Sequence, residues 1–350
     1  MMSAEQEKSP ISRPTSREHF TVAVFCALPK EANAVSYLFT ETWAQPMYGK
    51  ADKDENTYTL GRIGDHNVVL VHMAGMGKRS ACQAASCARS SYPGIKLALV
   101  VGIFGGLPRG DGHNELILGD VIISDDIVQY DLGRQYPGTF ETRSGHEVRR
   151  QPPREFQSIL SKLKSTRGRT AFAAKISQYV RVQCSGLAPE PVKYPGYDQD
   201  ELFQPEYRHE HREPSACNSC DGDEGETVRI CAKAQTLPCD SLKCDKKFLV
   251  KRKRLEFALK HEAPLPEVHI GPVGSGDTVM KSGLHRDRIA DQHGLLAFEM
   301  EASGVCNVFP ALVIKGVCDY ADSHKNKSWQ EYSALTAAAG MKAFLEEWAG

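Results

Sequence analysis

The sequence predicts an α/β protein with a mostly parallel central sheet, because short apolar segments alternate with helical ones. Residues 20–28 form an apolar run, and Pro29 directly after it suits the first turn of a helix. Residues 97–101 and 120–124 are further short apolar runs with β-branched side chains, as is typical of buried strands. Strands that alternate with helices in this way form mainly parallel sheets.

The remaining elements fit the same architecture. Two apolar segments, residues 57–63 and 68–73, flank a Gly-Asp-His-Asn turn and predict a hairpin. A Gly-Met-Gly-Lys segment at residues 75–78 then leads into an Ala/Ser/Cys-rich helix. Regular structure resumes at residue 268 after a long polar stretch, and residues 328–348 predict a final helix.

Composition excludes several classes of protein. The chain has 350 residues, of which 41% are hydrophobic and 25% charged, as in ordinary soluble globular proteins. A net charge of −1 gives no case for a nucleic-acid or membrane partner. No apolar run reaches the roughly 18 residues of a membrane span. Residues 1–19 lack the apolar core of a signal peptide. We therefore expect a disordered tail at 1–19, a single domain at 20–350, and a cytoplasmic protein.

The composition changes between about residues 184 and 262, which we interpret as an insertion. The segment is polar and holds six of the eleven cysteines. Without an export signal, these are expected to be free thiols or metal ligands. Cys217 and Cys220, with His209 and Cys244, are candidate zinc ligands. Because there is one Cys-x-x-Cys pair and not two, free cysteines in a loose loop are the alternative, and no other cofactor is expected.

Two glycine segments follow strands. Residues 102–106 (Gly-Ile-Phe-Gly-Gly) and 274–277 (Gly-Ser-Gly-Asp) either let a ligand approach the backbone or form tight turns. The segment alone does not separate these readings at 102–106, whereas a turn is favoured at 274–277.

Two groups of acids sit where strands end near the C-terminus. Glu299 and Glu301 follow the apolar residues 295–298, and Asp319 follows residues 309–317, which are apolar except for Lys315. Acids at the carboxyl ends of strands lie where open α/β sheets bind ligands. Helix-start acids are the alternative, and for Glu299 this explanation is as good as a functional one. Glu301 and Asp319 are therefore the strongest candidates for a site.

Several motifs then follow one another in a set order along the chain. They are Ala-Leu-Pro-Lys-Glu-Ala at 27–32, Gly-Met-Gly-Lys at 75–78, the glycine segment at 102–107 with Gly-Asp-Val-Ile at 119–122, Ser-Gly-Asp at 275–277, Phe-Glu-Met-Glu-Ala at 298–302, and Asp319. In this order they resemble the nucleoside phosphorylase and nucleosidase superfamily, most of all the methylthioadenosine/adenosylhomocysteine nucleosidase branch. The resemblance covers residues 20–130 and 266–348. It implies a three-layer sandwich around a mixed, mostly parallel sheet, with the Cys-rich segment as an insertion.

Three further segments, residues 130–137, 194–203 and 319–326, resemble the nucleosidase-like domains at the N-terminus of fungal NOD-like proteins. Because no ATPase or repeat region follows, we expect a stand-alone or excised domain. Residues 194–203, and the Tyr-Arg-His at 207–209, are expected to form a lid over the 5′ end of a substrate.

The resemblance implies roles for individual residues. Asp319 would act as the acid at N7 of a purine leaving group, and Glu301 would hold the ribose hydroxyls, with Glu299 beside it. Met300 would pack on the sugar, whereas the base pocket would be lined by Phe104, Gly105 and Val279. Glu31 would orient the attacking water. Cleavage of a ribose–base bond passes through an oxocarbenium-like state, which these groups would stabilise.

The sequence favours water over phosphate as the attacking group. Phosphorylases of this fold carry arginines at the glycine strand and after the first strand, where this chain has Val100 and residues 28–31 (Leu-Pro-Lys-Glu). Lys30 is a poor replacement for two fixed guanidinium groups. We therefore predict a purine nucleoside ribohydrolase that is a homo-oligomer, with a dimer favoured. The alternatives are a phosphorylase with a remodelled phosphate site and a non-catalytic module that senses nucleosides.

Overall fold

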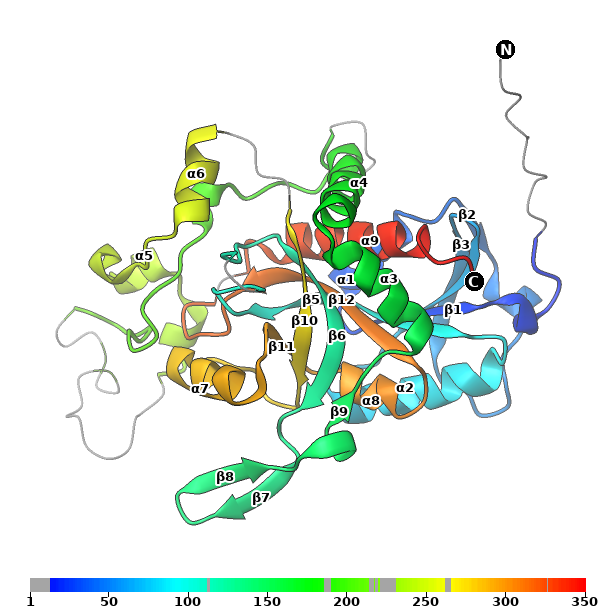
Figure 1. Ribbon diagram of the computed structural model, residues 1–350, viewed down its shortest axis with the longest axis horizontal. Helices are drawn as coiled ribbons and strands as arrows, with labels where there is room; N and C mark the ends of the chain where they lie inside the picture. The colour runs from blue at the N-terminus through cyan, green and yellow to red at the C-terminus, as the bar shows by residue number, and fades with distance from the viewer. Residues whose placement is uncertain are drawn as a thin grey trace.

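The computed structural model describes residues 13–111, 114–185, 190–213, 217, 220, 231–261, 266–325 and 327–350. Within these residues, ten strands form one mixed sheet in the order β11-β10-β6-β12-β5-β1-β4-β3-β2, with β9 paired to β6. The strands are β1 (Val22–Cys26), β2 (Glu41–Trp43), β3 (Thr57–Ile63), β4 (His66–His72), β5 (Leu97–Gly106), β6 (Val121–Gln129), β9 (Arg149–Arg150), β10 (Val268–Ser275), β11 (Ala297–Glu299) and β12 (Ala311–Asp319). A separate hairpin, β7 (Gly133–Tyr136) with β8 (Thr139–Thr142), projects from the body (Figure 1).

The sheet closes on itself at one end. β5 is parallel to β12 and β1, while its last residues, Gly105 and Gly106, pair antiparallel with β11. Because β11 also pairs with β10, the strands β5, β12, β6, β10 and β11 form a ring. The carboxyl ends of β1, β5, β11 and β12 therefore meet at one place.

Helices cover both faces of the sheet. One layer holds α1, α3, α4 and α9, and α9 contacts both β12 and β5 (Figure 1). The opposite layer holds α2 and α8. The helices are α1 (Pro29–Ser36), α2 (Lys78–Ser91), α3 (Arg154–Lys164), α4 (Thr166–Cys184), α5 (Cys239–Leu242), α6 (Lys253–His261), α7 (Gly283–His293), α8 (Ala302–Cys306) and α9 (Gln330–Leu345). The expected three-layer α/β fold with a mixed sheet is thus confirmed, and none of the described helices is long and apolar enough to cross a bilayer.

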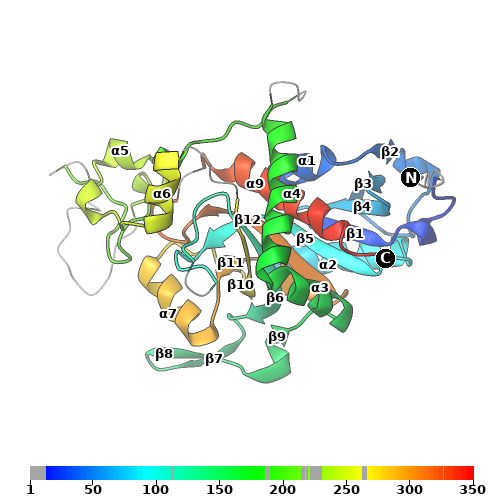
Figure 2. The same ribbon diagram turned by 45° about the horizontal axis from the view of Figure 1, so that its top comes forward.

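The expected insertion lies between α4 and β10. Its described parts, including α5 and α6, gather at the end of the molecule away from β1–β4, as Figures 1 and 2 both show. Asp200 ties it to the sheet region: its carboxylate is buried and pairs with Arg252 at 2.7 Å, while Tyr320 donates to it at 2.8 Å. The insertion is therefore packed against the loop that follows β12.

Two local expectations need correction. The glycines at 102–106 continue β5 instead of forming a loop or turn after it, since β12 and β11 pair with them. Within the expected disordered tail, residues 1–12 lie outside the described residues, but residues 13–19 pack on the domain. The carbonyl of Pro14 accepts a hydrogen bond from the Tyr48 hydroxyl at 3.1 Å.

A buried charged network joins the starts of β6 and β10 to the insertion. The imidazole of His269 is fully buried between Asp111 (2.8 Å) and Asp120 (3.1 Å), and Arg254 of α6 pairs with Asp120. Burial would lower the pKa of His269, but the two carboxylates outweigh burial and raise its pKa to about 9. His269 is therefore charged at neutral pH and balances the two acids.

This network predicts a pH-dependent stability. Because the pKa of His269 is raised on folding, its contribution is complete below the unfolded pKa of 6.5 and is lost as pH rises through about 9. We expect a contribution of about 3 kcal/mol to the free energy of unfolding. Urea denaturation at pH 6.5 and 9.5 should show this loss in the wild type and not in His269→Asn. The exposed control His146→Asn should behave like the wild type, and equal pH dependence in all three proteins would contradict the assignment.

Candidate active site

The carboxyl ends of β1, β5, β11 and β12 surround one cleft. All eight residues that the sequence singled out for catalysis or substrate binding line it. They are Glu31, Phe104, Gly105, Val279, Glu299, Met300, Glu301 and Asp319. These residues lie up to 288 positions apart in the chain, so the closure of the sheet is what brings them together.

Glu31 stands in the first turn of α1 and is held by backbone donors. The N–H groups of Ala27 and Leu28 donate to one carboxylate oxygen, and that of Ile103 on β5 donates to the other, each at 2.9 Å. Burial raises the pKa of Glu31, although these donors and Lys315 act in the opposite direction. Gly102 makes this approach possible, since a Cβ there would lie 2.0 Å from the Glu31 carboxylate.

A lysine inside β12 holds a cluster of buried carboxylates. Lys315 donates to Glu301 at 2.7 Å and lies 3.5 Å from Glu299. Burial would lower the pKa of Lys315, but the charges of Glu301, Glu299 and Glu31 outweigh burial and raise it. Burial would raise the pKa of Glu301, but Lys315 outweighs burial and lowers this pKa. Glu301 is thus ionised. The second Glu301 oxygen accepts a hydrogen bond from the Gly77 N–H at 3.3 Å.

Glu299 caps the short helix α8. Its carboxylate accepts hydrogen bonds from the N–H groups of Glu301 (2.9 Å) and Ala302 (3.0 Å). Burial raises the pKa of Glu299. This geometry matches the helix-start alternative, and it fixes the backbone that carries Met300 and Glu301.

Asp319 is presented by an irregularity in the sheet. The pairing of β12 with β5 shifts register between Val317 and Asp319, a bulge of the kind that redirects side chains near sites. Its carboxylate accepts hydrogen bonds from the Ala321 N–H (2.8 Å) and from Lys325 Nζ (2.9 Å). A Cβ on Gly105 would lie 2.8 Å from Asp319, so this glycine also permits a close approach.

Lys325 gives Asp319 a fixed cationic partner. Burial would lower the pKa of Lys325, but the negative charge of Asp319 outweighs burial and raises it. The pair presents one ammonium and one carboxylate at the wall of the cleft. Both Lys325 and Lys315 were missed as site residues. A lone lysine in the apolar run 309–317 was the signal for Lys315, whereas nothing in the sequence indicated Lys325.

Apolar side chains complete the cleft. Phe104 is buried and Met300 half-buried, whereas Val279 is 48% exposed and stands with Met76 at the rim. The arrangement gives one apolar wall beside two polar corners, one formed by Glu31 with Glu301 and the other by the ion pair of Asp319 with Lys325. Such a cleft suits a ligand with a flat apolar part and several hydroxyl groups.

Two other groups of residues that the sequence singled out do not lie where they were expected. The candidate zinc ligands fall into two groups, with His209 and Cys244 in one and Cys217 and Cys220 in the other. The described residues 194–209 do not line the cleft. They contact the loop that follows Asp319, where His324 Nε2 lies within hydrogen-bond distance of the Tyr207 carbonyl. Tyr194, for example, packs on Trp329 and Tyr332 in the core. The expectation of a lid over the cleft is therefore not met.

Comparisons with known proteins agree with this geometry. The family model described as Phosphorylase superfamily matches residues 21–183. The chain is 31% identical over 346 residues to a nucleotide-binding leucine-rich repeat (NLR)-like protein of Hyaloscypha variabilis. The aligned residues cover 97% of this chain and 30% of that protein. It is 30% identical over 113 residues to the 5′-methylthioadenosine/S-adenosylhomocysteine nucleosidase of Mycobacterium bovis, covering 32% and 39% of the two chains. The chain thus spans about a third of the length of these relatives.

Among solved structures, the nucleosidase of the same name from Neisseria meningitidis, in complex with methylthio-immucillin-A, has a TM-score of 0.52 and 15% identity. The match covers 94% of this chain and 99% of that one, which establishes a shared fold. Residues 21–183 thus match the phosphorylase superfamily, and the chain as a whole shares the fold of these nucleosidases.

The carboxylate cluster predicts a large effect of Lys315→Met. Removing the lysine leaves buried carboxylates without their counter-charge, so we expect a loss of about 3–5 kcal/mol in the free energy of unfolding. The exposed control Lys96→Met should change it by less than about 0.5 kcal/mol. Urea denaturation provides the measurement. Adding Glu301→Gln to Lys315→Met should recover part of the loss, and a double variant no more stable than the single one would argue against this pairing.

Proposed function

We propose that the chain is a purine nucleoside ribohydrolase, which cleaves the N-glycosidic bond with water. The observation that carries this proposal is the position of Glu31. Its carboxylate accepts hydrogen bonds from the backbone N–H groups of Ala27, Leu28 and Ile103, at the end of the glycine strand. Exposed N–H groups of this kind are what a phosphate would otherwise use. A fixed carboxylate there repels a phosphate dianion and can orient and deprotonate a water.

The charge balance of the cleft supports the same reaction. Glu301 is ionised, and Lys315 is engaged by Glu301 and Glu299. Lys30, the substitute considered for a phosphate ligand, donates instead to Gln330 at 2.9 Å. Among the described residues that line the cleft there is no arginine. A cleft with surplus carboxylates stabilises positive charge developing at C1′ of a ribose and disfavours a second anion.

Each residue then has one task. Glu301 accepts hydrogen bonds from the ribose 2′- and 3′-hydroxyls, while Met300 packs on the sugar. Phe104, Gly105 and Val279 contact the base. Asp319 faces N7 with Lys325 behind it, and this pair supplies the proton that the departing base requires. Because Lys325 contributes a charged N–H donor beside Asp319, we assign proton delivery to the pair and not to the carboxyl group alone.

A nucleoside sensor is the second candidate. It is favoured by the similarity to the NLR-like protein over 97% of this chain. Both candidates require the same cleft, and they differ in turnover. A sensor would bind a nucleoside with no release of free base, whereas the hydrolase would release base and ribose.

The reaction itself is tested by product analysis. Adenosine, inosine, guanosine and methylthioadenosine should be incubated with and without phosphate, and we expect free base and ribose from at least one in both conditions. Asp319→Asn keeps the shape but cannot transfer a proton, so kcat should fall about 10²–10⁴-fold. The exposed control Asp52→Asn should retain wild-type rates. Ribose 1-phosphate formed only with added phosphate would identify a phosphorylase, and binding without turnover would identify a sensor.

The pH profile tests the role of Glu31. Burial raises the pKa of Glu31 above its ordinary value of 4.5, and the base acts only when deprotonated. The acidic limb of kcat/KM should therefore lie above pH 4.5, with activity lost as pH falls through it. Glu31→Gln should lower kcat/KM about 10²–10⁴-fold and abolish this limb, while the exposed control Glu141→Gln should leave the profile unchanged. A Glu31→Gln enzyme with the wild-type profile would remove Glu31 from this role.

A further inference from the structure

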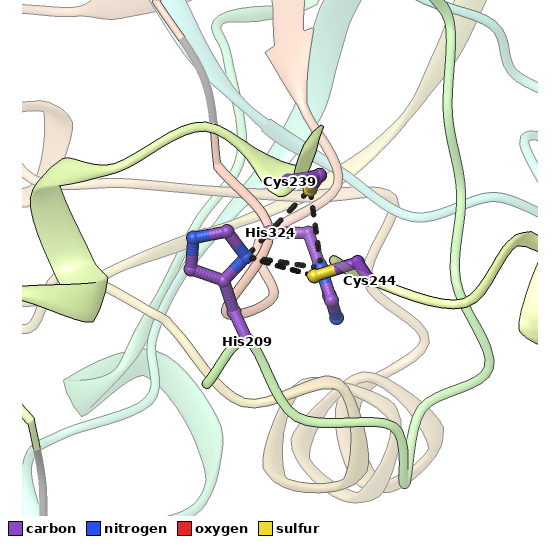
Figure 3. A group of neighbouring side chains, drawn as sticks. All are labelled: His209, Cys239, Cys244 and His324. Carbon is purple, nitrogen blue, oxygen red and sulfur yellow. Dashed lines mark hydrogen bonds between the residues drawn. The ribbon is translucent and has the colours of Figure 1, made fainter. Parts of the chain in front are cut away.

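We propose that His209, Cys239, Cys244 and His324 bind a structural zinc ion that fastens the insertion to the loop carrying Asp319. One ligand atom from each residue lies within 4.8 Å of all the others. Three of the residues come from the insertion, whereas His324 lies five residues after Asp319 (Figure 3). Two cysteines and two histidines form a complete tetrahedral ligand set for zinc.

The distances fit a common centre. The two Nδ1 atoms lie 3.3 Å apart, Cys239 Sγ lies 3.6 and 3.5 Å from the Nδ1 atoms of His209 and His324, and Cys244 Sγ lies 3.7 Å from that of His209. A tetrahedron with Zn–N of about 2.05 Å and Zn–S of about 2.3 Å has N–N edges of about 3.3 Å and N–S edges of about 3.5–3.6 Å. The side chains are thus spaced as ligands around one ion.

The opposite nitrogen of each imidazole orients its ring. Nε2 of His209 lies 2.9 Å from the carbonyl of Leu237, and Nε2 of His324 lies 3.0 Å from that of Tyr207. A carbonyl only accepts, so both Nε2 atoms carry the proton and the neutral rings direct bare Nδ1 atoms at each other. Two facing lone pairs at 3.3 Å repel each other, and a cation bound between them removes that repulsion. Zinc-bound histidines characteristically use the second nitrogen in this way.

The backbone around the cysteines is shaped for the same centre. Cys239 opens the short helix α5, Lys243 adopts the left-handed region with φ 58°, and the Cys244 N–H donates to the Cys239 carbonyl at 3.0 Å. This turn brings both sulfurs to one side, as Figure 3 shows. His209 and His324 are both buried, so the centre is shielded from solvent, as in structural zinc sites.

The second group has its own ligand set, one histidine and three cysteines. Cys217 Sγ lies 3.5 Å from Cys231 Sγ, and His211 Nδ1 lies 3.4 Å from Cys220 Sγ and 3.7 Å from Cys231 Sγ. His209 and His211 are two residues apart, yet they serve different groups. We assign a second zinc to this group, which lies within the insertion.

The first site has a consequence for the cleft. His324 is adjacent to Lys325, the partner of Asp319, and Ser323 accepts a hydrogen bond from the His209 N–H at 3.1 Å. A metal at His324 would thus fix the end of the loop that begins at Asp319. Any effect of this metal on kcat rests on the proposed hydrolase function, whereas the metal site itself does not.

Metal analysis of the purified chain tests the sites directly. We expect about two zinc ions per wild-type chain, and about one in either Cys239→Ser or Cys231→Ser. The half-exposed Cys82→Ser is the matched control and should keep both. A wild-type chain with no zinc, which neither takes up added zinc nor gains thermal stability from it, would overturn the proposal. So would a Cys239–Cys244 disulfide found by thiol counting.

The link to the cleft is tested by His324→Ala and by mild chelation of the wild type. Both should speed hydrogen exchange in residues 319–325, and zinc should reverse the effect only in the chelated wild type. If the chain is a hydrolase, kcat should also fall by about 10–100-fold. Zinc without nucleoside turnover in the wild type would defeat the proposed function and leave the sites standing. If His324→Ala does not fold, the chelated wild type decides: unchanged exchange after loss of zinc would refute the link.

Discussion

The ion cluster around Lys315 is the interaction on which the site depends. Its ammonium lies inside a central strand, where an unpaired charge would cost several kcal/mol. Glu299 at the end of β11 and Glu301 just before α8 compensate it, and Glu31 adds its charge from α1. In turn, one lysine keeps a buried glutamate ionised. The cluster therefore couples the packing of β12 against its neighbours to the electrostatics of the cleft, and neither can be changed alone.

Two glycines of β5 make room for this chemistry. Any side chain at Gly102 would strike Glu31, and any at Gly105 would strike Asp319 and Ala321. The backbone thus comes within hydrogen-bond reach of one acid and in contact with the other. The sequence left open whether a ligand approaches these glycines or they form a turn, and the groups that approach them most closely are side chains of the protein itself.

The pattern of apolar runs predicted β1, the β3–β4 hairpin, α2 and α9 closely, because each is marked by local periodicity and turn residues. The eight candidate site residues line one cleft, since ordered motifs at strand ends constrain where acids can lie. What the sequence could not provide is long-range. The β5–β11 pairing that closes the ring depends on contacts nearly 200 residues apart, and Lys325 acquires meaning only once the loop folds back on Asp319. The grouping of five cysteines with three histidines likewise depends on which loops meet.

The loop from Asp319 to Lys325 is held from two sides. Asp319 accepts the N–H of Ala321, which adopts the left-handed region with φ 53°, and Asp322 accepts that of His324. A non-glycine residue in that region persists where the surroundings impose it. The sheet imposes the start of the loop through the bulge before Asp319, and the insertion imposes its end through His324. An insertion attached here can thus fix the end of the loop that carries Asp319 without lining the cleft.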